Sequence, residues 1–304
     1  KKLSGINGKK KFIRTKKGKV IDSEIEAAIN GQDIVTTIDS KIQYLVYEEL
    51  KKAVNFYKAS SASAILVNLK NRNILAMANY PSFDPNNRRS IDVSLLSNRA
   101  VTDLFEPGST IKPLSLAGLL EDKIINNNTK IETSPGFIDY KGFITKDFKN
   151  YGFIDLSEVI SKSSNVAMVK LCDKAEADSI IKNLYRWGFG RYMNEIFIST
   201  REGYLPNSEN LSDREKVSLC YGYGMQITLA QLVAAYSALF DEGNIKGLNL
   251  ISGSFDAFDE KVISSELAKD INTMLLKTVE EGTGTKAKVE GMKISGKTGT
   301  TKRL

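Results

Sequence analysis

A buried helix begins within the stretch Phe105-Glu106-Pro107-Gly108-Ser109-Thr110-Ile111-Lys112-Pro113. Proline is tolerated only near the first turn of a helix, where backbone N–H groups lack intrahelical partners, so Pro113 places the helix start close to Ser109. The apolar residues from 114 to 120 predict that this helix is buried. Ser109 and Lys112 then lie one turn apart on one face, and the helix dipole favours a developing alkoxide on the serine.

Two more motifs follow Ser109-Thr110-Ile111-Lys112, first Ser163-Ser164-Asn165 and then Lys297-Thr298-Gly299-Thr300. Their order is that of enzymes in which a lysine activates a nucleophilic serine. The chain has no histidine, which excludes a Ser-His-Asp triad and requires another base. We therefore predict that Ser109 is the nucleophile and that Lys112 is its base.

Each motif alone is weak, because the chain repeats two of them elsewhere. A second Ser-x-x-Lys occurs at Ser179 and Lys182, and a second Ser-x-Asn at Ser208 and Asn210. The surroundings of Ser179 are typical of a helix interior with a solvated polar face, so we interpret that pair as structural. The ordered set of three motifs, each in a suitable local context, favours a catalytic site.

Ser163-Ser164-Asn165 interrupts two apolar helical patterns, at residues 156–160 and 166–171. A polar joint between buried helices either caps a helix or directs its side chains into a cavity. Beside the other two motifs, we predict that it forms the second wall of a cleft.

The last motif has a competing interpretation. Residues 291–298 match the nucleotide-binding pattern G-x-x-x-x-G-K-[ST]. A P-loop needs a buried strand before it and a helix after it, but the preceding residues are polar and Thr298 is followed by Gly299 and Thr300. We instead predict a short strand over residues 293–300 that presents Lys297 to a groove.

The stretch from Arg99 to Pro113 resembles the active-site segment of class B penicillin-binding proteins, and among these the septal transpeptidases of cell division. Further segments are similar to the same family: 3–8, 74–86, 162–166, 221–228 and 282–285. The resemblance implies a mixed α/β (α+β) fold, with an antiparallel-type sheet flanked by helices as in serine β-lactamases. It implies a transpeptidase domain at 36–304, preceded at 1–35 by a remnant of the N-terminal pedestal domain. Family members continue beyond the Lys-Thr-Gly strand, so we expect this domain to lack its C-terminal strands and helix.

The resemblance also implies the reaction, which is cross-linking of peptidoglycan stem peptides that end in D-Ala-D-Ala. Ser163 would relay a proton to the leaving amine and Asn165 would hold the substrate amide, while backbone N–H groups of Ser109 and Thr300 would form the oxyanion hole. Four residues would hold the terminal carboxylate: Lys297, Thr298, Gly299 and Thr300. Tyr221 and Tyr223 would line the opposite wall, although core packing explains them equally well.

The same resemblance implies binding of β-lactam antibiotics, divisome membrane proteins and a glycosyltransferase as partners, and no cofactor or metal. It places the catalytic domain on the outer face of the cytoplasmic membrane, held by an N-terminal anchor absent from this chain. A β-lactamase, a β-lactam-sensing domain and an inactive divisome scaffold share the motifs and remain alternatives.

Further expectations come from the charge, the apolar runs and the cysteines of the chain. The net charge of +7 is concentrated partly in residues 9–19, which we interpret as a solvated hairpin and not as a nucleic-acid site. No apolar run reaches the length of a membrane span. Cys172 and Cys220 lie in apolar helical contexts, which favours buried thiols over a disulfide.

We also predict a strand at 34–38, a helix capped by Asp39 that runs to about residue 53, a hairpin at 63–67 and 74–78, and a helix over 229–239.

Overall fold

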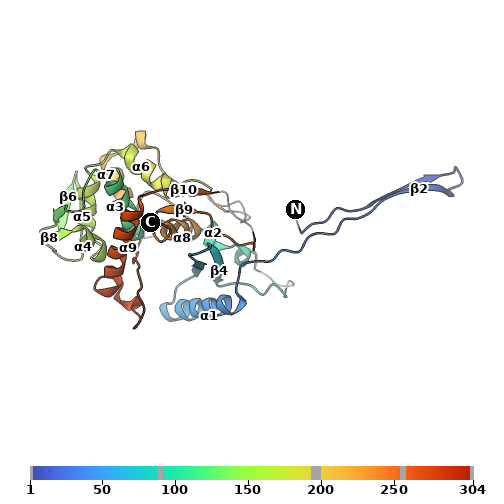
Figure 1. The fold of residues 1–304 in the computed structure, drawn as a ribbon, viewed down its shortest axis with the longest axis horizontal. Helices are drawn as coiled ribbons and strands as arrows, with labels where there is room; N and C mark the ends of the chain where they lie inside the picture. The colour runs from blue at the N-terminus through green and yellow to red at the C-terminus, as the bar shows by residue number, and fades with distance from the viewer. Residues whose placement is uncertain (1–2, 88–91, 193–199, 254–257, 302–304) are drawn as a thin grey trace.

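The computed structural model describes residues 3–87, 92–192, 200–253 and 258–301. One hairpin near the N-terminus extends far from a body that holds the other elements (Figure 1). The strands are β1 (Lys9–Arg14), β2 (Val20–Glu26), β3 (Ala62–Asn68), β4 (Asn73–Tyr80), β5 (Lys130–Glu132), β6 (Phe137–Tyr140), β7 (Phe143–Lys146), β8 (Phe153–Asp155), β9 (Asn244–Lys246) and β10 (Asp259–Lys261). The α-helices are α1 (Ser40–Tyr57), α2 (Arg99–Thr102), α3 (Lys112–Glu121), α4 (Leu156–Ser161), α5 (Asn165–Cys172), α6 (Ala177–Arg186), α7 (Asp213–Leu219), α8 (Leu229–Ala238) and α9 (Ser265–Glu280). The 3₁₀ turns are η2 (Val93–Leu96), η3 (Gly108–Ile111), η4 (Ser208–Asn210) and η5 (Thr285–Ala287).

The described strands form antiparallel pairs: β1–β2, β3–β4, β5–β8, β6–β7 and β9–β10. The predicted hairpin is confirmed as β3–β4, in which Ala64 pairs with Ala78. Asn249 lies against this hairpin, because its carbonyl accepts a hydrogen bond of 2.9 Å from the backbone N–H of Ile74. The mixed α/β class and its antiparallel pairing are therefore as predicted, with the pairing divided among short ladders.

Helix α1 begins where the sequence predicts. The side chain of Asp39 accepts hydrogen bonds from the backbone N–H groups of Lys41 and Ile42. The helix runs past residue 53 to Tyr57. The strand predicted at 34–38 is reduced to one bridge between Thr36 and Ile251, so that prediction was wrong in extent. The N–H of Thr37 donates to the carbonyl of Leu250 and the N–H of Ser252 donates to the carbonyl of Val35, each at 2.8 Å. This pairing is too short to form a ladder.

The basic N-terminal stretch forms the β1–β2 hairpin, as predicted, and every residue of both strands is exposed. Figure 1 shows it projecting from the body as a long arm. Lys11 and Glu24 face each other across the two strands at 3.3 Å. Since both partners are solvated, this pair contributes little to stability.

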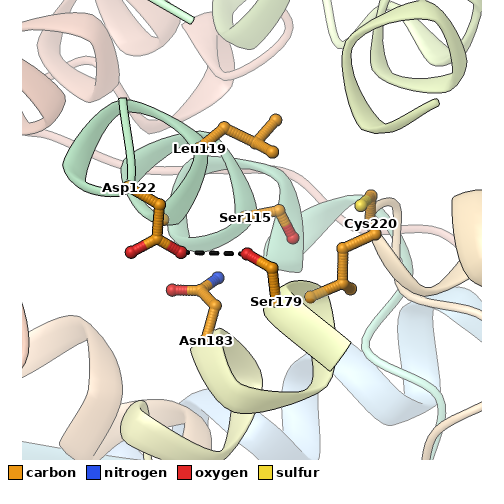
Figure 2. A pocket seen from close by; sticks show the side chains of 8 residues that line it. Ser115, Leu119, Asp122, Ser179, Asn183 and Cys220 are labelled. Carbon is orange, nitrogen blue, oxygen red and sulfur yellow. Dashed lines mark hydrogen bonds between the residues drawn. The ribbon is translucent and has the colours of Figure 1, made fainter. Parts of the chain in front are cut away.

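Helix α3 is the centre of the core, and residues 112–119 are all buried. It packs against α5, α6 and α9. A small cavity separates α3 from α6, and on its wall Ser179 donates a 3.0 Å hydrogen bond to Asp122 (Figure 2). Lys182 pairs with Asp178 on the exposed face of α6. The second Ser-x-x-Lys pair is therefore structural, as interpreted from the sequence.

The two cysteines contradict the sequence interpretation. Cys172 and Cys220 form a disulfide, with Cα atoms 6.5 Å apart. Each ends a helix, α5 and α7 respectively, and these helices pack together in the core. A sequence separation of 48 residues gave no local sign of this approach, so buried thiols were the wrong prediction.

The strand predicted at 293–300 is absent from the described structure, in which this segment runs without a strand partner. Its neighbour is a helix: the backbone N–H of Gly296 donates to the carbonyl of Leu275 in α9 at 3.2 Å. A helix surface offers no ladder of free backbone groups, so no strand forms here and the prediction was wrong.

Candidate active site

Ser109 lies in the 3₁₀ turn η3, which passes directly into α3 at Lys112. Gly108 opens this turn with a φ of +53°, a conformation that favours glycine. The hydroxyl of Tyr236 donates a 2.6 Å hydrogen bond to the carbonyl of Thr110 and holds the turn from the side. Ser109 is half-buried, and its hydroxyl makes no hydrogen bond to another described residue, so it is available to a ligand.

Lys112 is fully buried, and its amine has three neighbours within hydrogen-bond distance. Nζ lies 2.6 Å from the carbonyl of Ser163, 2.7 Å from Oδ1 of Asn165 and 3.3 Å from Oγ of Ser163. A neutral amine has two N–H bonds, which the carbonyl and the amide oxygen accept. Its lone pair then remains free to receive a proton. The structure thus joins the first two sequence motifs through Lys112.

The hydroxyl of Ser163 lies between two lysines. Nζ of Lys297 donates to it at 2.8 Å, and Nζ of Lys112 lies 3.3 Å from it. Ser163 itself has a φ of +59°, which is strained for a residue with a Cβ and is typical of functional sites. All three motifs therefore meet at this hydroxyl.

Burial and charge perturb both amines. Burial lowers the pKa of Lys112 well below its ordinary value, the ammonium of Lys297 lowers it further, and the carboxylate of Asp147 acts in the opposite direction. Burial also lowers the pKa of Lys297, to about 8. Burial and the nearby charge therefore favour the neutral amine of Lys112, while a pKa of about 8 leaves most of Lys297 charged at pH 7.

Asp147 is a residue of this site that the sequence did not reveal. Its carboxylate accepts hydrogen bonds from Oγ of Ser164 and the backbone N–H of Asn165, each at 2.6 Å, and from the N–H of Val166 at 3.0 Å. These contacts fix the start of α5, and with it the side chain of Asn165. No local pattern connects Asp147 with a motif 18 residues away.

The Lys-Thr-Gly segment lies against the serine turn, as the sequence predicted. A Cβ on Gly108 would stand 2.8 Å from the carbonyl oxygen of Thr300, and one on Gly299 would stand 2.7 Å from the side chain of Thr110. Oγ1 of Thr298 is 2.9 Å from Oγ1 of Thr283, a contact that the sequence did not predict. Residues 288–292 contain no strand, so this segment lacks the buried strand that a P-loop needs before its glycine-rich turn.

Tyr221 and Tyr223 line a cleft of about 770 Å³ that also includes Asn165. Their rings pack edge to face, 5.6 Å apart, and Tyr221 is buried while Tyr223 is half-buried. The strand β7 and the helix α7 supply other walls. The structure thus gives both tyrosines a place beside the site, while their contact with substrate remains a prediction.

Comparison with known proteins agrees with this geometry. Residues 62–304 match the penicillin binding protein transpeptidase domain family. The chain belongs to that family. It is 33% identical over 307 residues to the peptidoglycan D,D-transpeptidase FtsI of Escherichia coli K12, covering 99% of this chain and 51% of that protein. It is 34% identical over 304 residues to FtsI of Buchnera aphidicola from Schizaphis graminum, covering 99% of this chain and 53% of that protein.

A solved structure confirms the fold of this family member. The transpeptidase domain of Burkholderia pseudomallei penicillin-binding protein 3, without ligand, superposes with a TM-score of 0.78 at 29% identity, covering 88% of this chain and 76% of that one. The chain spans about half the length of the curated relatives it matches. It is an FtsI-like, class B member of the family, as its motifs indicated. No described helix is long and apolar enough to cross a bilayer.

Proposed function

We propose that this chain is the catalytic domain of a peptidoglycan D,D-transpeptidase that acts in cell division. The observation that carries the proposal is the buried amine of Lys112, held by Ser163 and Asn165 one turn from Ser109. A lysine with a depressed pKa can act as a general base at neutral pH. That property is what a serine nucleophile needs in a chain without histidine.

In the first half-reaction, Oγ of Ser109 attacks the carbonyl of the penultimate D-Ala and its proton passes to Lys112. Backbone N–H groups of Ser109 and Thr300 stabilise the oxyanion, a contribution of about 3 kcal/mol for each donor. The C–N bond then breaks, and the terminal D-Ala leaves as an amine after receiving a proton through Ser163. The result is an acyl ester on Ser109.

In the second half-reaction, the amine of another stem peptide attacks this ester. The base accepts the proton of that amine, a new amide cross-link forms, and the hydroxyl of Ser109 is restored. Lys297, Thr298 and Thr300 hold the terminal carboxylate of the donor during acylation, with Gly299 allowing close approach to Thr110. β-Lactams acylate the same serine because their strained amide and carboxylate imitate D-Ala-D-Ala.

Partners and location follow from the same proposal. Acting in division, the domain would be anchored to the cytoplasmic membrane and face outward, beside divisome membrane proteins and a glycosyltransferase that supplies glycan strands. We assign residues 1–35 to the end of a pedestal and 36–304 to the transpeptidase domain, since the exposed hairpin β1–β2 extends from the body (Figure 1).

Labelling with a fluorescent penicillin tests the assignment of the nucleophile. We expect one adduct, on the peptide that contains Ser109, because Ser109 lies one turn before Lys112 at the start of α3, whereas the hydroxyl of Ser163 is engaged by Lys297. Ser109→Ala should remove the label. Ser179→Ala is the matched control, because Ser179 belongs to the other Ser-x-x-Lys pair and bonds to Asp122, and it should label like the parent. Recovery of the adduct on another serine by peptide mapping would refute the assignment.

The lifetime of that adduct separates a transpeptidase from a β-lactamase of the same fold. A transpeptidase waits for an amine acceptor, so its penicilloyl ester should persist for many minutes to hours. Release within seconds would favour the β-lactamase.

Acylation should also depend on pH through Lys297. Its pKa is about 8, so its positive charge is lost as the pH rises through that value, and capture of the penicillin carboxylate should weaken on the alkaline side. Lys112 must be neutral, so acylation should fall as the pH drops below the depressed pKa of that residue. The measurement is the second-order acylation rate between pH 5 and 10.

Lys297→Arg provides the control for this profile. A guanidinium keeps its charge throughout the range, so this variant should lose the alkaline decline even if its overall rate is lower. An identical alkaline decline in parent and variant would mean that another group titrates.

A further inference from the structure

The cleft beside Asn165 contains a cation without an ionic partner. The guanidinium of Arg214 lies over the ring of Phe143, 3.8 Å from its centroid, and both residues line the cleft. Arg214 forms no ion pair within the described part of the chain, whereas Arg186 pairs with Asp122 at 3.0 Å. Stacking on the aromatic ring restricts the guanidinium while leaving its N–H edge free for an acceptor.

The other charged groups of the cleft leave Arg214 available. Glu215 is occupied at the start of α7, where its carboxylate accepts from the backbone N–H of Ser212 at 2.9 Å and from its hydroxyl at 2.6 Å. The carboxylate of Glu106 accepts a 2.8 Å hydrogen bond from the N–H of Gly224. Lys146, the remaining charged lining residue, is a second cation. The hydrogen bonds from Ser212 lower the pKa of Glu215, and the charge of Arg214 contributes to that lowering. No carboxylate among the described residues forms an ion pair with Arg214, however, so a ligand near it meets an unpaired guanidinium.

The position of the cleft fixes which part of a ligand enters it. The lining of the cleft includes neither Ser109 nor residues 297–300, so a donor whose terminal carboxylate is held at Lys297 would place another of its portions there. Asn165 belongs both to the catalytic contacts of Lys112 and to the wall of the cleft. The donor portion that precedes the reactive D-Ala therefore extends along Tyr221 toward Arg214.

We infer that Arg214 is a specificity-determining residue that binds a carboxylate in this portion of the acyl donor. The inference rests on the proposed function, because it assumes acylation at Ser109. The ligand class is a peptide or penicillin whose acyl side chain bears a carboxylate, which the planar guanidinium can bind through two parallel hydrogen bonds.

The test compares two penicillins that differ by one group. Carbenicillin carries a carboxylate on the side chain that benzylpenicillin lacks, and both have the same β-lactam and ring carboxylate. We expect Arg214→Gln to lower the ratio of their second-order acylation rates, carbenicillin over benzylpenicillin, by about tenfold, the size of one charge-assisted hydrogen bond. Arg214→Lys should lower this ratio of acylation rates less than Arg214→Gln does. Raising the salt concentration should lower the ratio in the parent but not in Arg214→Gln.

Lys216→Gln is the matched control. It removes one positive charge from the same helix, but Lys216 bonds to the carbonyl of Asp173 and does not line the cleft. Its ratio should equal that of the parent. An unchanged ratio in Arg214→Gln, with benzylpenicillin still acylating Ser109, would overturn this inference alone. Absence of acylation by both penicillins in the parent would overturn the proposed function and this inference together.

Discussion

Lys112→Ala should lower the rate of penicillin acylation by about 10³-fold, the contribution expected of a positioned general base. The amine of Lys112 is the group whose pKa burial and Lys297 lower, and no other described amine contacts both Ser163 and Asn165. The measurement is the second-order rate of labelling by fluorescent penicillin. A variant that acylates at the parental rate would require another base.

The fold should survive this change. Lys112 is completely buried, and an uncharged side chain removes the cost of desolvating an amine, which offsets the lost hydrogen bonds. Lys112→Met fills the same space and should give the same loss of rate with a thermal midpoint closer to the parent. Lys182→Ala is the matched control, because Lys182 belongs to the structural Ser-x-x-Lys pair on α6, and it should change neither rate nor midpoint appreciably.

Gly222→Ala should also strongly lower the rate of penicillin acylation. A Cβ at this position would stand 2.1 Å from the carbonyl oxygen of Gly108 and 2.4 Å from its nitrogen, and the φ of Gly222 is +90°. The N–H of Gly108 also donates to the carbonyl of Gly222 at 3.0 Å. The turn that carries Ser109 must therefore move, and a displacement of about 1 Å at a nucleophile costs on the order of 10²-fold in rate.

Stability should fall as well, by roughly 1–3 kcal/mol from backbone strain alone. Gly224→Ala separates the two effects. Gly224 has a φ of +79°, but a Cβ there would meet only the side chain of Leu219, at 3.8 Å. This control should lose stability with little change in acylation. Equal acylation rates for the two variants would contradict the idea that Gly222 positions the serine turn.

The sequence predicted local features well because their causes are local. Pro113 restricts where a helix can begin, and the structure has the 3₁₀ turn of Ser109 directly before α3. Asp39 caps α1 through its own near neighbours. The hairpin β3–β4 follows from alternation in two adjacent stretches. In each case the interacting groups are close together in the sequence, so a short sequence pattern is enough to predict the structure.

Predictions failed where a partner distant in sequence decides the result. The segment 293–300 was predicted as a strand, but it lies against α9 and pairs with no strand among the described residues. The helical contexts of Cys172 and Cys220 indicated burial correctly, yet only the packing of α5 on α7 brings the two sulfurs together.

The residues alone favour one kind of chemistry. The order of three motifs and the absence of histidine indicate a lysine-activated serine, because both depend only on residue type and spacing. The pKa values of the two lysines depend on the tertiary structure. Packing brings Lys297 to Ser163 across 134 residues and buries Lys112. It also places the carboxylate of Asp147 at the N-terminus of α5. A lysine becomes a base only when desolvation and a nearby cation lower its pKa, and both arise from packing of distant segments.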